Sequence, residues 1–289
     1  MTFTNGRFIW IKEHCLLDLL IYLVYCYKIN CFEGKMSTEK HLPEIASRLL
    51  DLHDQVDSSY LFPTPEPKAR ALIKQNPFAF CAAVCLDRGT KADIIWTIPY
   101  WIQQRVGHFD PKRFYQLSFE EISQLFEALP KKPRYTNAAP ITFQDITRIV
   151  VEQFSGDAEA IWRNRNAAEV RETFLSVYGV GRGIANLALI LIESAYGFTF
   201  SDLDHTQMDI KPDVHTTLVL YRLGVAPRID QGDAIQTARM LNPSYPAKVD
   251  AALWYIGREF CRPSNPDCSN CRMHDICPRV GIIEGHLWS

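Results

Sequence analysis

Several features that would mark a common class of protein are missing from this sequence. The formal net charge is only -2 with a pI near 6.4, so no overall positive charge indicates binding to nucleic acid or to an acidic membrane. No internal repeat or low-complexity segment is visible, and period-two alternation of β-branched residues is scarce. A β-rich fold and a repeat protein are therefore disfavoured. Any contact with DNA must use a local basic surface.

Long hydrophobic runs are also few. The strongest, CLLDLLIYLVYCY at residues 15–27, is shorter than the about 20 apolar residues that cross a bilayer, and Asp18 interrupts it. A signal peptide would need a small-residue cleavage site, which does not follow here. We expect no membrane segment. EGKM at residues 33–36 back-translates to a purine-rich stretch before a start codon, which suggests that residues 1–35 are an extension and that the functional chain begins near Met36.

A disulfide framework is not indicated either. Nine cysteines are an odd number, and a secreted disulfide scaffold is improbable at 289 residues. Five cysteines stand in apolar or helical-looking stretches without regular spacing and are interpreted as buried, reduced side chains: Cys15, Cys26, Cys31, Cys81 and Cys85. A reducing cytoplasm is the expected compartment.

What the chain does contain is a large apolar fraction in helical patterns. Hydrophobic residues make up 47% and aromatic residues 12%, which is ample for a core. Residues 76–86 begin with Asn-Pro and continue almost entirely apolar, which predicts a helix buried on most sides. We predict an all-α fold, with further helices at 44–56, 92–105, 118–128, 142–154, 167–176, 184–195, 214–223, 230–240 and 246–259. Segments 61–68 and 129–140 are proline-rich, and we expect a connector and a basic surface loop there.

The remaining four cysteines lie close together in CRPSNPDCSNCRMHDIC, residues 261–277. Thiolates spaced as C-x6-C-x2-C-x5-C in a reducing compartment must share a ligand or a metal. Structural zinc sites usually bring two C-x2-C pairs, whereas only Cys268 and Cys271 form such a pair here. A [4Fe-4S] cluster also takes four thiolates and tolerates a compact loop.

Two further motifs precede the cysteines. FLSVYGVGRGIANLALILIE, residues 174–193, predicts two helices joined by a Gly-Val-Gly turn that lets the backbone approach a phosphate, although such turns are also common packing devices. MDIKPDVHTTLVLYRLG, residues 208–224, contains Asp213, which follows Pro212 and precedes an amphipathic helix. Asp213 is therefore a natural N-cap, with Asp209 as the competing carboxylate.

In this order, the three motifs resemble those of the endonuclease III branch of helix-hairpin-helix DNA glycosylases, over approximately Asn76 to Val280. The resemblance implies a six-helix barrel domain at residues 76–199. It implies a second helical domain from residues 36–75 and 200–289, which surrounds a [4Fe-4S] cluster. The cluster ligands would be Cys261, Cys268, Cys271 and Cys277, with zinc as the alternative metal.

The resemblance also implies the residues of a DNA site. Asp213, in the family's D-x-H sequence, would stabilise the positive charge that develops on the sugar as the bond to a flipped base breaks. Arg88 stands at the position of the wedge residue, where the family usually has glutamine. The hairpin turn would grip the backbone of double-stranded DNA through Gly179, Val180, Gly181 and Arg182. Possible supporting residues are Lys211, His215 and Asp209.

One departure from the family is informative. Bifunctional members carry a lysine two residues after the second hairpin glycine, where this chain has Gly183. We therefore predict a monomeric, monofunctional glycosylase that leaves an abasic site, with Lys211 and Lys91 as conceivable substitutes for the lysine. The excised base stays open among uracil or thymine in mismatches, alkylated purines and bulky modified cytosines.

Other interpretations of the same residues stay open. The fold could serve a non-catalytic DNA-structure-binding protein, or the cysteines could staple an unrelated helical protein through zinc. Trp96, Tyr100 and Trp101 could stack on an extruded base, although helical spacing of this kind is more typical of a core.

Overall fold

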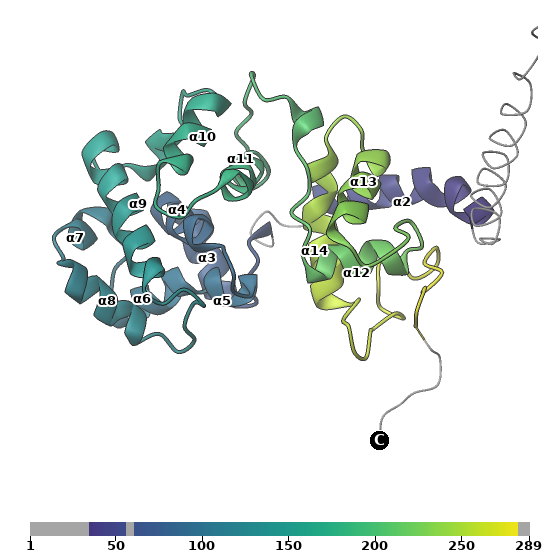
Figure 1. Ribbon diagram of the computed structural model, residues 1–289, viewed down its shortest axis with the longest axis horizontal. Helices are drawn as coiled ribbons and strands as arrows, with labels where there is room; N and C mark the ends of the chain where they lie inside the picture. Colours follow the sequence, from purple (N-terminus) through teal and green to yellow (C-terminus); the bar gives the residue numbers. More distant parts are fainter. Residues whose placement is uncertain (1–34, 56–60, 283–289) are drawn as a thin grey trace, which may run out of the picture. The chain divides into compact units, whose positions relative to one another are not determined.

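The protein is described here by a computed structural model, in which residues 35–55 and 61–282 are placed and side chains are described from residue 41 onward. Two compact units, Met1–Glu44 and Ile45–Ser289, divide the chain. Helix α2 (Lys35–Gln55) contains the boundary between the units, and all later elements belong to the second unit. In the described ranges every regular element is a helix and none is a strand (Figure 1), so the predicted all-α class is confirmed.

The apolar run at residues 15–27, with Cys15, Cys26 and Cys31, lies outside the described residues. Among the helices that are described, none combines the length and the apolar character needed to cross a membrane. Cys81 and Cys85 are buried free thiols, as predicted.

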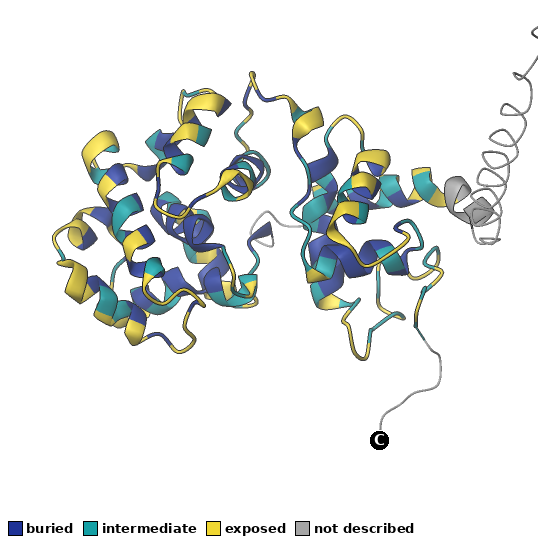
Figure 2. Cartoon of the chain, viewed as in Figure 1, coloured by how far each residue is buried: buried dark blue, intermediate teal, exposed yellow. Residues whose placement is uncertain are grey.

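Nine helices of the second unit build one large hydrophobic core. They are α3 (Pro67–Gln75), α4 (Pro77–Leu86), α5 (Ala92–Ile95), α6 (Ile98–Val106), α7 (Pro111–Tyr115), α8 (Phe119–Glu127), α9 (Ala138–Phe154), α10 (Ala167–Leu175) and α11 (Arg182–Tyr196). Every residue of α4 after Pro77 is buried (Figure 2), because α3, α6, α9 and α11 all pack against this helix. The prediction of a helix buried on most sides is confirmed.

Aromatic side chains fill the centre of this core. The Phe80 ring lies 6.2 Å from Trp96 and 5.8 Å from Trp162, measured between ring centroids. Trp96 has 0% exposure and stacks on Phe62, so it is a core residue and cannot stack on a base. Of the two interpretations of this aromatic group, packing is the correct one for Trp96.

Several helix boundaries differ from the prediction: the helix predicted at 44–56 begins at Lys35, and the one predicted at 246–259 is η4 followed by α14. Proline explains two further differences. The helix predicted at 92–105 is two helices, because Pro99 has no amide hydrogen to bond back to the preceding turn. The helix predicted at 142–154 begins four residues earlier, at Ala138. Pro140 lies in its first turn, where an amide has no partner within the helix and proline is tolerated.

The last helices pack on one another and carry the C-terminal motifs. They are α12 (Val214–Arg222), α13 (Gln231–Leu241) and α14 (Asp250–Glu259), with the short 3-10 helices η3 (His205–Gln207) and η4 (Pro246–Val249). Helix α14 packs against α12 and η4, while α13 packs against α12 and η4. A further 3-10 helix, η2 (Ala158–Ile161), contacts α4 and α9.

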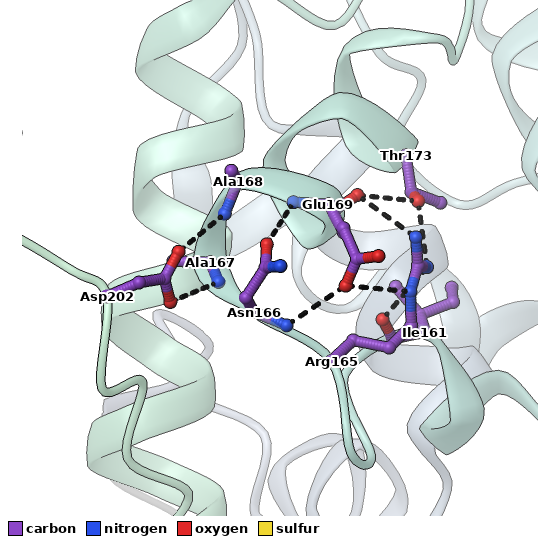
Figure 3. Close-up of polar contacts among 8 residues, drawn as sticks. All are labelled: Ile161, Arg165, Asn166, Ala167, Ala168, Glu169, Thr173 and Asp202. Carbon is purple, nitrogen blue, oxygen red and sulfur yellow. Dashed lines mark hydrogen bonds and ion pairs between the residues drawn. The ribbon is translucent and has the colours of Figure 1, made fainter.

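The start of α10 is tied to the connector that leads from α11 toward Asp213. Asn166 caps α10 by accepting a hydrogen bond from the Glu169 amide at 2.9 Å, and Glu169 accepts one from the Asn166 amide. The Asp202 carboxylate accepts bonds from the amides of Ala167 and Ala168 in the same first turn (Figure 3). Because Asp202 lies between α11 and α12, these bonds fix the path of the chain between the hairpin and Asp213.

Candidate functional site

The turn between α10 and α11 presents its backbone to solvent. Gly179 and Gly181 are exposed, and Gly179 has a φ of 78°, which favours glycine. Val180 is buried and anchors the turn to the core. Helix α11 begins after Gly181 with no side-chain cap, whereas Asn76, Ser118 and Asn166 cap other helices of this unit. The first amides of α11, at Arg182 and Gly183, are therefore left to an external acceptor such as a phosphate.

Arg88 lies directly against this turn. A Cβ built on Gly179 would come within 1.2 Å of its guanidinium nitrogen Nη1, so the Arg88 side chain occupies the space that a side chain at position 179 would take. Its Nη2 donates a hydrogen bond to Thr142 Oγ1 at 2.7 Å, and the guanidinium lies over the rings of Tyr135 and Tyr178. Both rings are about half exposed. The structure thus brings the predicted wedge residue Arg88 and the hairpin turn together on one surface.

Asp213 is the N-cap of α12, as predicted. Its Oδ1 accepts hydrogen bonds from the amides of His215 and Thr216 at 2.8 and 2.9 Å. Thr216 completes a capping box, because its hydroxyl oxygen accepts a bond from the Asp213 amide at 2.9 Å. Among the described residues, nothing forms a hydrogen bond with Oδ2 of Asp213, so one oxygen holds the helix and the other is available for chemistry.

A pocket opens beside Asp213. Helices α11 and α14 contribute apolar side chains, among them Leu187, Ile190 and Trp254. The polar side chains that line it are His53, Asp87, Ser194, Lys211, Asp213 and Asp250. The pocket is small, with a volume of about 50 Å³, and combines apolar walls with a few convergent polar groups.

The two other acidic and basic candidates near Asp213 are already paired. Asp209 accepts two hydrogen bonds from Arg239, each 2.7 Å long, which commits both of its oxygens to a surface ion pair. Lys211 donates from Nζ to the carboxylate of Asp87, whose side chain is only 3% exposed. The structure therefore favours Asp213 over Asp209 as the free carboxylate.

His215 does not face the pocket opening but packs toward α14. Its ring lies 6.1 Å from that of Trp254, and its Nδ1 is buried without a hydrogen-bond partner in the described part of the chain. A Cβ on Gly257 would lie 2.6 Å from the His215 Cβ, so α12 and α14 touch where α14 has no side chain. The position of the Asp213 cap thus depends on glycine at 257.

We expect Gly257→Ala to destabilise the protein by about 1–3 kcal/mol, because the added methyl group must push α12 away from α14. The measurement is chemical denaturation. Gly232→Ala in α13 is the matched control, since the nearest atom to its Cβ is the tip of the flexible Asp230 side chain at 3.2 Å. Equal stability of the two variants would contradict the close contact at Gly257.

Arg222, the last residue of α12, anchors the cysteine loop. Its side chain is only 7% exposed and donates hydrogen bonds to the carbonyl oxygens of Arg262 and Pro263 at 2.7 and 3.0 Å. It also lies 3.5 Å from Sγ of Cys261, and the thiol of Cys277 donates to the Arg222 carbonyl. One short helix, about 14 Å long at 1.5 Å per residue, therefore joins the cysteine loop to Asp213.

The four thiols of this loop are neighbours. Burial, with smaller contributions from the other three thiols, raises the pKa of Cys271 to about 11. The pKa values of Cys261 and Cys277 are also raised, mainly by burial. Within the described residues, no group of three or more His, Cys, Asp or Glu side chains is arranged as it stands to hold a metal ion. The cluster therefore stays a prediction from the spacing and the proximity of the thiols.

No family model matches the chain. In sequence it is similar to the protein named "Endonuclease III" of Bacillus subtilis (strain 168), with 22% identity over 210 residues, covering 71% of this chain and 83% of that protein. In structure it is similar to a protein described as a thermostable thymine-DNA glycosylase, with a TM-score of 0.50 and 17% identity, covering 84% of this chain and 98% of the other. The predicted resemblance is confirmed, and the chain has the all-helical fold of a DNA glycosylase.

Three residues at the site escaped the sequence analysis. Asp250 stands before an apolar helical run, where an acidic residue is ordinary and carries no special signal. Arg222 and Gly257 are single residues within helical patterns. Their roles depend on contacts with segments about 40 residues away, at Arg262 and His215 respectively, which local spacing does not reveal.

Proposed function

We propose that the protein is a DNA glycosylase that takes one base out of double-stranded DNA and hydrolyses its N-glycosidic bond. One observation carries the proposal: Asp213 lines a pocket, and its Oδ2 is not used in the helix cap. Asp213 also follows, along the chain, the exposed hairpin turn whose helix α11 has no side-chain cap. The similarity to an endonuclease III and to a thymine-DNA glycosylase supports it.

In the proposed mechanism, the amides at the start of α11 bind a phosphate and so position the duplex without reading its sequence. Arg88 and the two tyrosine rings beside it occupy the surface next to the turn. The stacked bases of the DNA duplex must open at this surface. The extruded base enters the pocket. As the base departs, Oδ2 of Asp213 stabilises the positive charge on the sugar and orients the attacking water.

We propose that the enzyme is monofunctional. Gly183 has no nucleophile at the position of the family's lysine, and Lys211 is held in an ion pair with Asp87. A Schiff base requires an amine that is free to attack the sugar, whereas Nζ of Lys211 is bonded to Asp87. We expect no covalent protein–DNA product when borohydride is added during the reaction, as judged on a denaturing gel. Efficient trapping that disappears in Lys211→Ala would contradict this assignment.

We further propose that Cys261, Cys268, Cys271 and Cys277 hold a [4Fe-4S] cluster, with zinc as the alternative. Four neighbouring thiols on a compact loop are a chemically suitable donor set. The raised pKa values of Cys261, Cys271 and Cys277 describe the thiols without metal, and binding would release their protons. The cluster would fix the loop against α12, and no step of the reaction is assigned to it.

The test of the proposed function is a screen of base release. Purified protein is incubated with duplexes that carry one uracil or thymine opposite guanine, one 3-methyladenine, or one glucosylated hydroxymethylcytosine. Alkali then cleaves the strand at any abasic site. We expect alkali-dependent cleavage of at least one duplex at the modified position. Binding of every duplex without release of any base would instead favour the non-catalytic DNA-binding interpretation.

A further inference from the structure

A second carboxyl group lies in the pocket beside Asp213. Asp250 is the first residue of α14 and lines the same pocket. Its Oδ1 is buried and has no hydrogen-bond partner in the described part of the protein. An aspartate at the start of a helix ordinarily caps the helix or faces solvent. Asp250 does neither, because α14 has no side-chain cap and Oδ1 of this half-buried residue is shielded from solvent.

Burial gives this group an unusual protonation state. Burial and the neighbouring charge of Asp213 raise the pKa of Asp250 to about 8, although the Lys211 amide and the Lys211 charge lower it. Two carboxylates in one buried site cannot both be charged without a large cost. Asp250 is therefore protonated at neutral pH.

The other titratable groups near α14 do not change this conclusion. The pocket and the elements packed on α14 supply these groups: Asp213, His215, Tyr221, Arg222, Lys211, Asp87, His53 and Lys248. Arg222 donates to the carbonyl groups of the cysteine loop. Lys211 bonds to Asp87, and Lys248 lies 3.3 Å from Asp54, so both cations have carboxylate partners other than Asp250. Burial lowers the pKa of His53, so this ring adds no positive charge at neutral pH.

We propose that Asp250 is the general acid of the base-release reaction, a catalytic residue that donates its proton to a nitrogen of the departing base while Asp213 stabilises the sugar. This inference rests on the proposed glycosylase function. The bonding electrons of the N-glycosidic bond pass to the base, and the proton of Asp250 neutralises them. Water adds to the sugar carbon and loses one proton, which restores Asp250. A protonated carboxyl group close to a second carboxyl group is the usual basis for such a division of roles.

The test uses the full-length protein and the duplexes of the screen. Single-turnover base release is measured across pH for wild type, for Asp250→Asn and for the control Asp233→Asn. Asp233 occupies the first turn of α13 and pairs with Arg228 on the surface. We expect Asp250→Asn to lose about 10²–10⁴-fold in rate at neutral pH, as for other general acids, without a change in DNA affinity. The rate of base release by the wild-type protein should fall tenfold per pH unit above about pH 8. This pH dependence should be absent from Asp250→Asn.

A second measurement does not depend on activity. In wild type labelled with carbon-13 at the aspartate carboxyl groups, one resonance should titrate near pH 8 and be absent from Asp250→Asn. A titration in the ordinary range for aspartate would overturn the inference. So would wild-type rates and an unchanged alkaline limb in Asp250→Asn. Either of those two results would leave the glycosylase proposal intact. If the wild-type protein releases no base from any duplex, both the glycosylase proposal and the inference about Asp250 are wrong.

Discussion

Asp213→Asn should lower the single-turnover rate of base release by about 10²–10³-fold or more, the loss expected when a preorganised electrostatic contact to the transition state is removed. Asparagine is as good an N-cap as aspartate, so its side-chain oxygen can still accept the amides of His215 and Thr216. The fold and the affinity for DNA should therefore be retained. What is lost is the negative charge on the oxygen that faces the pocket.

The comparison with Asp209→Asn makes this test specific. Asp209 lies four residues earlier, but both of its oxygens bond to Arg239. Its replacement should weaken a surface ion pair, which is worth at most about 1 kcal/mol, and leave base release unchanged. Loss of activity in Asp209→Asn with full activity in Asp213→Asn would show that the catalytic carboxylate has been assigned to the wrong residue.

Arg222→Ala should have the largest effect on stability, with a loss of about 3 kcal/mol or more. The substitution leaves the partly buried carbonyl groups of Arg262 and Pro263 without their donor, and it opens a space where the buried Arg222 side chain packs beside Cys261. A buried acceptor without a donor costs about 1–3 kcal/mol, and the lost packing of the buried arginine stem adds to this cost. The measurements are the free energy of unfolding in denaturant and the iron and sulfide content of the purified protein, both of which should fall.

Two further variants separate charge from geometry at this position. Arg222→Lys keeps the charge but cannot serve the two carbonyl groups with one planar guanidinium, so we expect an intermediate loss. Arg272→Ala removes an exposed arginine of the same loop and should change stability little. If Arg222→Ala were as stable as Arg272→Ala, the loop would not depend on α12.

Helix α12 connects two features of the candidate site, one at each end. The helix starts at the candidate catalytic carboxylate and ends at the anchor of the cysteine loop. A change in the loop can therefore move Asp213 without touching it, and Arg222→Ala should reduce base release as well as stability. The cysteine loop would thus have a positioning role for the site.

The sequence by itself determined the class of fold and much of the candidate site. Apolar residues at helical spacing, with Asn-Pro at the start of α4 and Pro-Asp before α12, define local structure because capping and periodicity act within a few residues. The hairpin turn and Asp213 could be found in this way, since each is a short motif at fixed spacing.

Only the tertiary structure decided what surrounds those motifs. It separated Asp213 from Asp209 by giving Asp209 an arginine partner, placed Arg88 against Gly179, and buried Asp250 beside Asp213. The charge state of a carboxyl group depends on solvent exclusion and on charges within a few ångströms. Both are supplied by segments distant in the chain, so no pattern of neighbouring letters can specify them.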